Sequence, residues 1–288
     1  MWTLMAVDVL VLTYNSGHDI DKFWKRFTES FPPTWNIYFR DNGGTRMELQ
    51  ELAAANDSGR IHICFGENIG FGSGINSLAS SARSEYLAIV NPDVSFAVQD
   101  LESLIDSLAR NESAQVIGPR LFDENGDRVS DANRLPSLFD IALRRPLRID
   151  IPPETSSLIP VGWISGAFMV WRRSAFEAVG GFDEDFFLFW EDVDICHRLP
   201  PGAAWIDAGV SVQHRVGGSH GRSPAMHKFN LESRMRYAHR HHGAVGAAAG
   251  AVGCLGEVAS MIRHSPQVRG VVRRSPFRHL RSSNDVPN

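Results

Sequence analysis

The stretch VDVLVLTYN, residues 7–15, decides the fold, because a run of valine and leucine ends there in a polar turn. Similar apolar runs recur at 36–39, 61–65 and 86–90, and helix-like segments lie between them at 19–27, 47–55 and 75–82. Strands that alternate with helices are joined by right-handed crossovers, which makes neighbouring strands parallel. We therefore predict an α/β fold with a mostly parallel central sheet and helices on both of its faces.

Polar or glycine-bearing residues follow each predicted strand, at 13–15, 41–44, 66–68 and 91–93. In open α/β sheets ligands bind outside the carboxyl ends of the strands, so we expect these loops to converge on one crevice. Glycines in 68–76 allow a phosphate to approach the backbone at a helix start, although a tight turn into a helix explains them equally well.

The pattern changes after residue 93. The sequence predicts a helix at 99–110, strands at 115–117, 162–171 and 204–214, and helix from residue 229 onward. Between residues 123 and 160 no regular pattern is visible, and a loop of that length in a compact domain is usually functional or mobile. We therefore expect this region to cover a substrate or to dock a partner.

Residues 180–194, GGFDEDFFLFWEDVD, place carboxylates among large aromatic and apolar side chains. Holding acids beside such surfaces costs desolvation free energy, which favours an active site over an ordinary surface loop. The structural alternative is an acidic helix start, because Glu191, Asp192 and Asp194 suit the first turn of a helix.

Composition bounds the class of protein. The chain has 288 residues, 43% of them hydrophobic, and a net charge of -4, which suits a large globular domain and argues against general nucleic-acid binding. The widely spaced Cys64, Cys196 and Cys254 fit a reducing compartment, and no signal-peptide pattern opens the chain. We expect a cytoplasmic protein.

The ordered set of motifs resembles family 2 glycosyltransferases of the GT-A fold, in particular their bacterial rhamnosyltransferase-like branch. The resemblance covers residues 7–243 and rests on LTYN (12–15), DNG (41–43), NIGFG (68–72), NPD (91–93), SGAFM (165–169) and FDE (182–184) leading to WEDVD (190–194). It implies a GT-A domain at 1–243 and leaves 244–288 as a helical, arginine-rich extension.

The same resemblance implies site residues. Thr13 and Asp41 would hold the nucleotide base, and Asp192 would be the general base, with Glu191 as the second choice. Further implied contacts are Asn68, Gly70, Phe71, Gly72 and Asn91 for the donor, Ser165, Gly166 and Ala167 for the acceptor, and Asp93 and His214 for a divalent Mg²⁺ or Mn²⁺. Asn91 stands where the family's metal motif has its first acid.

The leading hypothesis is inverting transfer of a sugar, such as rhamnose from dTDP-rhamnose, to a cell-surface polysaccharide or a polyprenyl-linked glycan. UDP-galactofuranose or a UDP-hexose is an alternative donor, and a non-catalytic sugar-nucleotide or glycan-binding module is an alternative class. A nucleotidyltransferase is disfavoured, because residues 13–17 contain no Arg or Lys for a triphosphate.

The end of the chain leaves two alternatives open. Residues 244–262 are too weakly apolar to predict a membrane span, and six arginines without an acid follow at 263–281. We expect residues 244–262 to form a packing helix. Together with the arginines, this helix either lies on the anionic inner membrane surface or is followed by a disordered arginine-rich tail. Nearby, His239, His241 and His242 resemble a metal cluster only on paper, and a solvated helix end capped by Gly243 is the expected structure.

Overall fold

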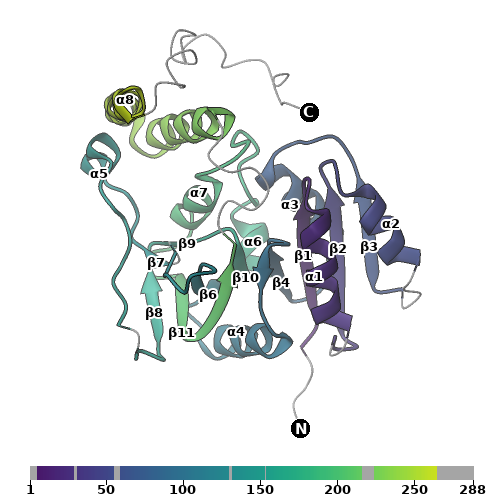
Figure 1. Ribbon diagram of the computed structural model, residues 1–288. Coiled ribbons are helices and arrows are strands. Elements are labelled where there is room, and N and C mark those ends of the chain that lie inside the picture. The colour runs from purple at the N-terminus through teal and green to yellow at the C-terminus, as the bar shows by residue number, and fades with distance from the viewer. Residues whose placement is uncertain are drawn as a thin grey trace. The chain divides into compact units, whose positions relative to one another are not determined.

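The computed structural model describes residues 5–28, 31–54, 59–129, 132–152, 154–215 and 224–264. By packing, the chain forms two compact units. The first combines Met1–Leu135 with Leu147–Gly221, and the second combines Pro136–Pro146 with Arg222–Asn288. Figure 1 shows the central sheet of the first unit and the helices of both.

The amino-terminal half of the sheet is parallel, as predicted. Its strands are β1 (Val7–Thr13), β2 (Trp35–Asp41), β3 (Ile61–Phe65) and β4 (Tyr86–Val90), in the order β3-β2-β1-β4. The connecting helices are α1 (Gly17–Thr28), α2 (Arg46–Ala54) and α3 (Phe71–Ala79). Val9 and Leu10 of β1 are both fully buried although they point to opposite faces, which is the burial expected of a central parallel strand.

The other half of the sheet is mixed, so the predicted parallel pairing runs through the first four strands and recurs in one further pair beyond them. Strand β10 (Phe168–Arg172) is antiparallel to β4 and to β6 (Val116–Phe122), while β11 (Ala204–His214) is parallel to β6. Two short strands, β5 (Val94–Ser95) and β8 (Leu158–Val161), add to β11 in antiparallel pairing. The direction reverses because the long segment before β10, rather than a crossover helix, brings the chain back to the sheet.

Residues 123–160, predicted to be irregular, contain short elements. Strand β7 (Ala132–Asn133) pairs with β9 (Trp163–Ile164), and α5 (Leu138–Leu143) and β8 follow. Elements of two to six residues show too little periodicity to be found from sequence. Ser137 starts α5 with a capping box, since its hydroxyl accepts a bond from the Asp140 amide and the Asp140 carboxylate accepts from the Ser137 amide.

Helices cover both faces of the sheet, as predicted. Phe23 of α1, Leu49 of α2 and Leu101 of α4 (Val98–Arg110) share one buried cluster with Val9. The opposite cluster contains Leu10 together with residues of α3, α6 (Arg173–Ala178) and α7 (Glu191–His197). The sheet is thus the middle of three layers.

The second unit consists of α5 and α8 (Pro224–His264). Gly243 interrupts α8 with φ 60° and ψ -147°, and the helix folds back there, since Gly250 lies against Ala238 and Cys254 Sγ lies 3.6 Å from the carbonyl oxygen of Leu231. The first helical segment of α8 therefore ends at Gly243, where a glycine-capped helix end was expected, and a second segment continues from there. No helix within the described residues has the length and apolar character needed to cross a membrane.

Candidate active site

The loop after β2 is organised by Asp41. One carboxylate oxygen accepts from the Thr13 hydroxyl at 3.2 Å and from the Gly43 amide at 2.9 Å, and the other accepts from the Thr45 amide at 3.3 Å. Thr13 is 0% exposed and Asp41 is 3% exposed. These two predicted nucleotide contacts thus shape the loop at 41–45 with their buried side chains.

Asn42 joins this loop to the glycine-rich loop. Its side-chain amide donates to Asn68 Oδ1 at 3.2 Å and to the carbonyl oxygen of Gly70 at 3.0 Å. Gly70 has φ 91°, and a Cβ there would lie 2.4 Å from the carbonyl oxygen of Phe187, so only glycine fits. Two of the predicted donor loops therefore lie together, as the topology required.

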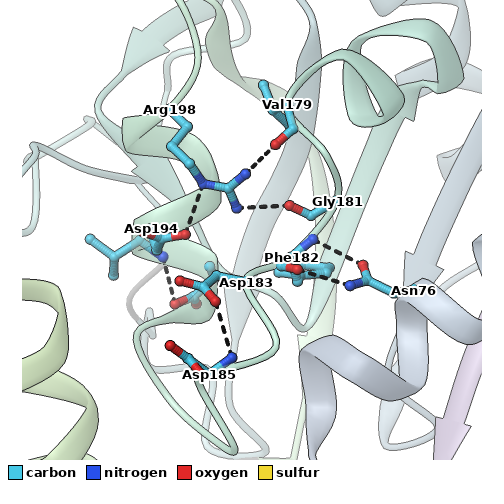
Figure 2. A network of polar contacts seen from close by, with 10 residues as sticks. Asn76, Val179, Gly181, Phe182, Asp183, Asp185, Asp194 and Arg198 are labelled. Atoms are coloured by element: carbon cyan, nitrogen blue, oxygen red, sulfur yellow. Dashed lines mark hydrogen bonds and ion pairs between the residues drawn. The ribbon is translucent and has the colours of Figure 1, made fainter. Parts of the chain in front are cut away.

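Hydrogen bonds near both ends tie the acidic segment 180–194 to the fold, as Figure 2 shows. Asn76 of α3 donates to the carbonyl oxygen of Phe182 at 2.8 Å and accepts from its amide at 2.9 Å. Arg198 binds the Asp194 carboxylate at 2.9 Å, the Gly181 carbonyl oxygen at 2.7 Å and the Val179 carbonyl oxygen. The structural alternative therefore applies to Asp194, which is 0% exposed and serves the fold.

The start of α7 is set by an unusual turn. Phe189 and Trp190 both have left-handed backbone conformations, with φ 68° and 66°. Non-glycine residues adopt this conformation at a cost of order 1 kcal/mol, and such residues concentrate at functional sites. The turn brings Glu191 and Asp192 into the first turn of α7.

Asp192 is half-buried and held by two amides. Gly166 N donates to Oδ2 at 3.1 Å, and Val193 N donates to Oδ1 at 2.9 Å. Burial raises the pKa of Asp192, and these two amides oppose that rise because they favour the charged carboxylate. The carboxylate thus keeps a fixed orientation and can take up a proton.

Glu191 differs from its neighbour. It is 5% exposed, and its Oε2 atom is buried without a hydrogen-bond partner. Burial, and after it the negative charge of Asp192, raises the pKa of Glu191 well above the usual value. The surroundings of Glu191 therefore favour its protonated form.

The loop at 165–167 connects Asp192 with the end of β4. Gly166 donates to Asp192, and the next residue, Ala167, accepts a bond from the Asn91 amide at 2.9 Å. A Cβ on Gly166 would lie 3.4 Å from Phe71 and 3.5 Å from the Cβ of Asp192. The predicted acceptor loop, donor loop and base thus meet within one network.

Asp93 and His214 also lie together, as predicted. His214 Nε2 is 3.4 Å from Asp93 Oδ1, and that oxygen is buried without a hydrogen-bond partner among the described residues. Within the described ranges, no group of three or more His, Cys, Asp or Glu side chains could hold a metal ion by itself.

Sequence reasoning missed the ion pair beside them. Arg215 Nη2 lies 2.7 Å and 2.6 Å from the two carboxylate oxygens of Asp19 in α1, and its backbone amide donates to the carbonyl oxygen of Asp93 at 3.3 Å. Burial raises the pKa of Asp19, and the charge of Arg215 opposes that rise. In the sequence Asp19 resembles an ordinary acid in the first turn of a helix. Local sequence patterns cannot link it with Arg215, which lies 196 positions away.

Solved structures define the class of the fold as GT-A glycosyltransferase. GalNAc-T7 with UDP, GalNAc and Mn²⁺ superposes with TM-score 0.63 at 15% identity, covering 92% of this chain and 59% of that one. Staphylococcus aureus TarS 1-349 in complex with UDP gives TM-score 0.56 at 17% identity, covering 94% and 75%.

Sequence comparison identifies the family. Residues 8–180 match Glycosyl transferase family 2. A Mycobacterium tuberculosis N-acetylglucosaminyl-diphospho-decaprenol L-rhamnosyltransferase is 30% identical over 265 residues, or 83% of this chain and 86% of the relative. Escherichia coli K12 rhamnosyltransferase WbbL is 30% identical over 175 residues, or 55% and 63%. The chain belongs to glycosyltransferase family 2, which confirms the predicted fold and enzyme class.

Proposed function

We propose that this glycosyltransferase transfers a deoxyhexose such as L-rhamnose, with inversion, from dTDP-rhamnose to a cell-surface glycan or its polyprenyl-linked precursor. Two relatives with rhamnosyltransferase names support the donor, and one of them names a decaprenyl diphosphate acceptor. A cytoplasmic location, with peripheral contact to the membrane through the basic carboxyl terminus, is part of the proposal.

The link from Asp192 through Gly166 and Ala167 to Asn91 carries the proposal. Inverting transfer needs a base on one face of the donor sugar and a charged diphosphate on the other. This short backbone connection keeps the distance between Asp192 and the loop at 91–93 constant while substrates bind and leave.

Asp192 is the proposed general base. In the reaction an acceptor hydroxyl oxygen bonds to the anomeric carbon, the bond from that carbon to the diphosphate oxygen breaks, and the hydroxyl proton moves to Asp192. The two amides that hold its oxygens favour the charged form at the start. When Glu191 beside it is protonated, no second negative charge opposes the later release of the proton from Asp192.

Asp93 and His214 fit a divalent cation. The buried Asp93 Oδ1 has no hydrogen-bond partner, and a carboxylate with an imidazole is a suitable donor set for Mn²⁺ or Mg²⁺ when diphosphate oxygens complete the coordination. Such an ion would neutralise the charge that grows on the leaving diphosphate. Structures of the same fold solved with Mn²⁺ support this assignment.

The nucleotide and acceptor contacts complete the proposal. Thr13 and Asp41 act by shaping the base-binding loop at 41–45, and backbone groups of residues 68–72 and Asn91 face the donor. Ser165, Gly166 and Ala167 border the acceptor.

The first test measures transfer and binding separately. Purified protein is assayed with dTDP-rhamnose, UDP-galactofuranose or a UDP-hexose and a polyprenyl diphosphate-linked N-acetylglucosamine acceptor, with and without Mg²⁺ or Mn²⁺. We expect a cation-dependent product from dTDP-rhamnose, with inverted anomeric configuration by NMR. Product only from a UDP sugar would change the donor, and nucleotide-sugar binding without any product would favour the non-catalytic module.

A further inference from the structure

The second half of α8 presents apolar residues to solvent. Among residues 244–259 the one charged residue is Glu257, and it points inward, with Oε2 2.7 Å from Arg234 Nη1. Val245, Val252 and Leu255 are 66%, 55% and 67% exposed. They recur at helical spacing, and the exposed residues between and beside them are alanine and glycine. A surface helix of a soluble protein normally exposes polar and charged residues, whereas this helix exposes apolar ones.

Helix α5 extends this surface. The carbonyl oxygen of Ile141 lies 2.3 Å from the position of a Cβ on Gly253, so the lack of a side chain there lets α5 pack directly on α8. Phe139 and Leu143, one turn apart on α5, are 73% and 58% exposed. We call Phe139, Leu143, Val245, Val252 and Leu255 the apolar face. Several large apolar side chains exposed on two helices that pack together indicate an interaction site.

Charge indicates the partner. Arg144 and Arg145 at the end of α5 are exposed, and six arginines follow at 263–281, whereas the acids of this unit are Asp140, Glu232, Glu257 and Asp285. The unit is therefore strongly basic. Pairing of two copies through the apolar face would bring two basic units together, which is electrostatically unfavourable, whereas an anionic lipid surface complements both properties.

We propose that the apolar face inserts into the headgroup region of an anionic membrane, to which the net positive charge of this unit attracts it. The unit then lies in the plane of the interface, as amphipathic helices do. This inference rests on and deepens the membrane contact of the proposed function, and it depends neither on the donor sugar nor on catalysis. A polyprenyl-linked acceptor of the proposed function would be met at the same surface.

Vesicle binding by the full chain tests the inference. The wild type is floated with phosphatidylcholine vesicles and with vesicles containing about 30% phosphatidylglycerol, beside the Val252→Ser/Leu255→Ser variant. Removing two exposed aliphatic groups should weaken partition to the anionic vesicles by about tenfold. Met47→Ser is the matched control, because Met47 is 72% exposed in the first unit and should leave partition unchanged.

Phe139→Ser provides an independent variant on α5, and thermal melts establish that each variant is folded. Residual binding of the wild type in 1 M salt, where arginine contacts are screened, should be lost in the double variant. Equal partition of wild type and folded variants would overturn the proposal. So would a wild-type dimer in solution that the double variant converts to monomer, because the apolar face would then cover a second copy. Transferase activity on a soluble acceptor is measured in parallel, so failure of either hypothesis is seen separately.

Discussion

Asp93 at the end of β4 and Glu191 at the start of α7 each bury one carboxylate oxygen without a hydrogen-bond partner. Their surroundings are opposite. His214 lies beside Asp93, whereas Glu191 has another acid, Asp192, as its neighbour. Burial favours a proton on Glu191 and the charge of Asp192 adds to that effect, whereas the imidazole beside the Asp93 oxygen suits a cation that both side chains share.

The largest effect is expected from Asp192→Asn, which keeps the shape of the side chain and removes the base. Transfer should fall by about 10³-fold, within the range for loss of a general base, while donor affinity stays within about twofold. Kinetics and calorimetric donor binding measure the two quantities. Asp185→Asn, at an exposed acid of the same segment, is the control; full activity in Asp192→Asn would assign the base elsewhere.

Asp93→Asn tests the other carboxylate. We expect transfer to fall by roughly 100-fold, because an amide is a weak ligand for a cation that stabilises the diphosphate. Thermal stabilisation by donor should lose its dependence on Mn²⁺ in this variant and keep it in Asp192→Asn. An unchanged Mn²⁺ dependence in Asp93→Asn would exclude Asp93 as a metal ligand.

The ion pair beside Asp93 is predicted to act on stability. Arg215→Met leaves the buried Asp19 without its counter-ion, which should cost about 1–3 kcal/mol in the free energy of unfolding. A double-mutant cycle with Asp19→Asn isolates the coupling between the two side chains. A coupling energy near zero by urea denaturation would mean that the pair does not hold α1 to the end of β11.

Glu191→Gln should give the smallest effect. The raised pKa of Glu191 means that its contribution to stability is present below the pKa of the unfolded state and is lost as pH rises through the folded-state pKa. Glutamine cannot ionise, so the variant should gain stability over wild type from pH 5 to pH 8. Denaturant titrations of both proteins at pH 5 and at pH 8 measure this difference. If the variant instead became less stable than wild type as the pH rises, a protonated Glu191 would be contradicted.

A strand could be predicted where the local sequence pattern alone identifies it. Val7–Thr13 needs only its β-branched run and the turn after it to be identified as a buried strand. Phe168–Arg172 looks the same from sequence, yet its antiparallel direction depends on the path of the preceding loop, which local pattern does not contain. Six-residue α5 was missed for lack of periodicity.

The site residues also divide into those that the sequence could predict and those that depend on the folded chain. The pair Asp93 and His214 was predicted from the resemblance to family 2 glycosyltransferases, and Asp93 also follows a predicted strand, where ligands bind in open sheets. The roles of Asn76, which binds Phe182, and of Arg215, which binds Asp19, depend on contacts 106 and 196 residues apart. Isolated Asn, Asp and Arg residues are common on surfaces, so only the folded structure reveals these contacts.

The ties of the acidic segment have a consequence for its entropy. Asn76 fixes the chain at Phe182, the Phe71 amide fixes it at Phe187, and Arg198 fixes Asp194, so each stretch between two fixed points is short. Loop-closure entropy grows by about 0.6 kcal/mol for each doubling of loop length, and short tied loops therefore order at little cost. A segment that is already ordered before substrate arrives does not take that cost from the binding free energy of the donor.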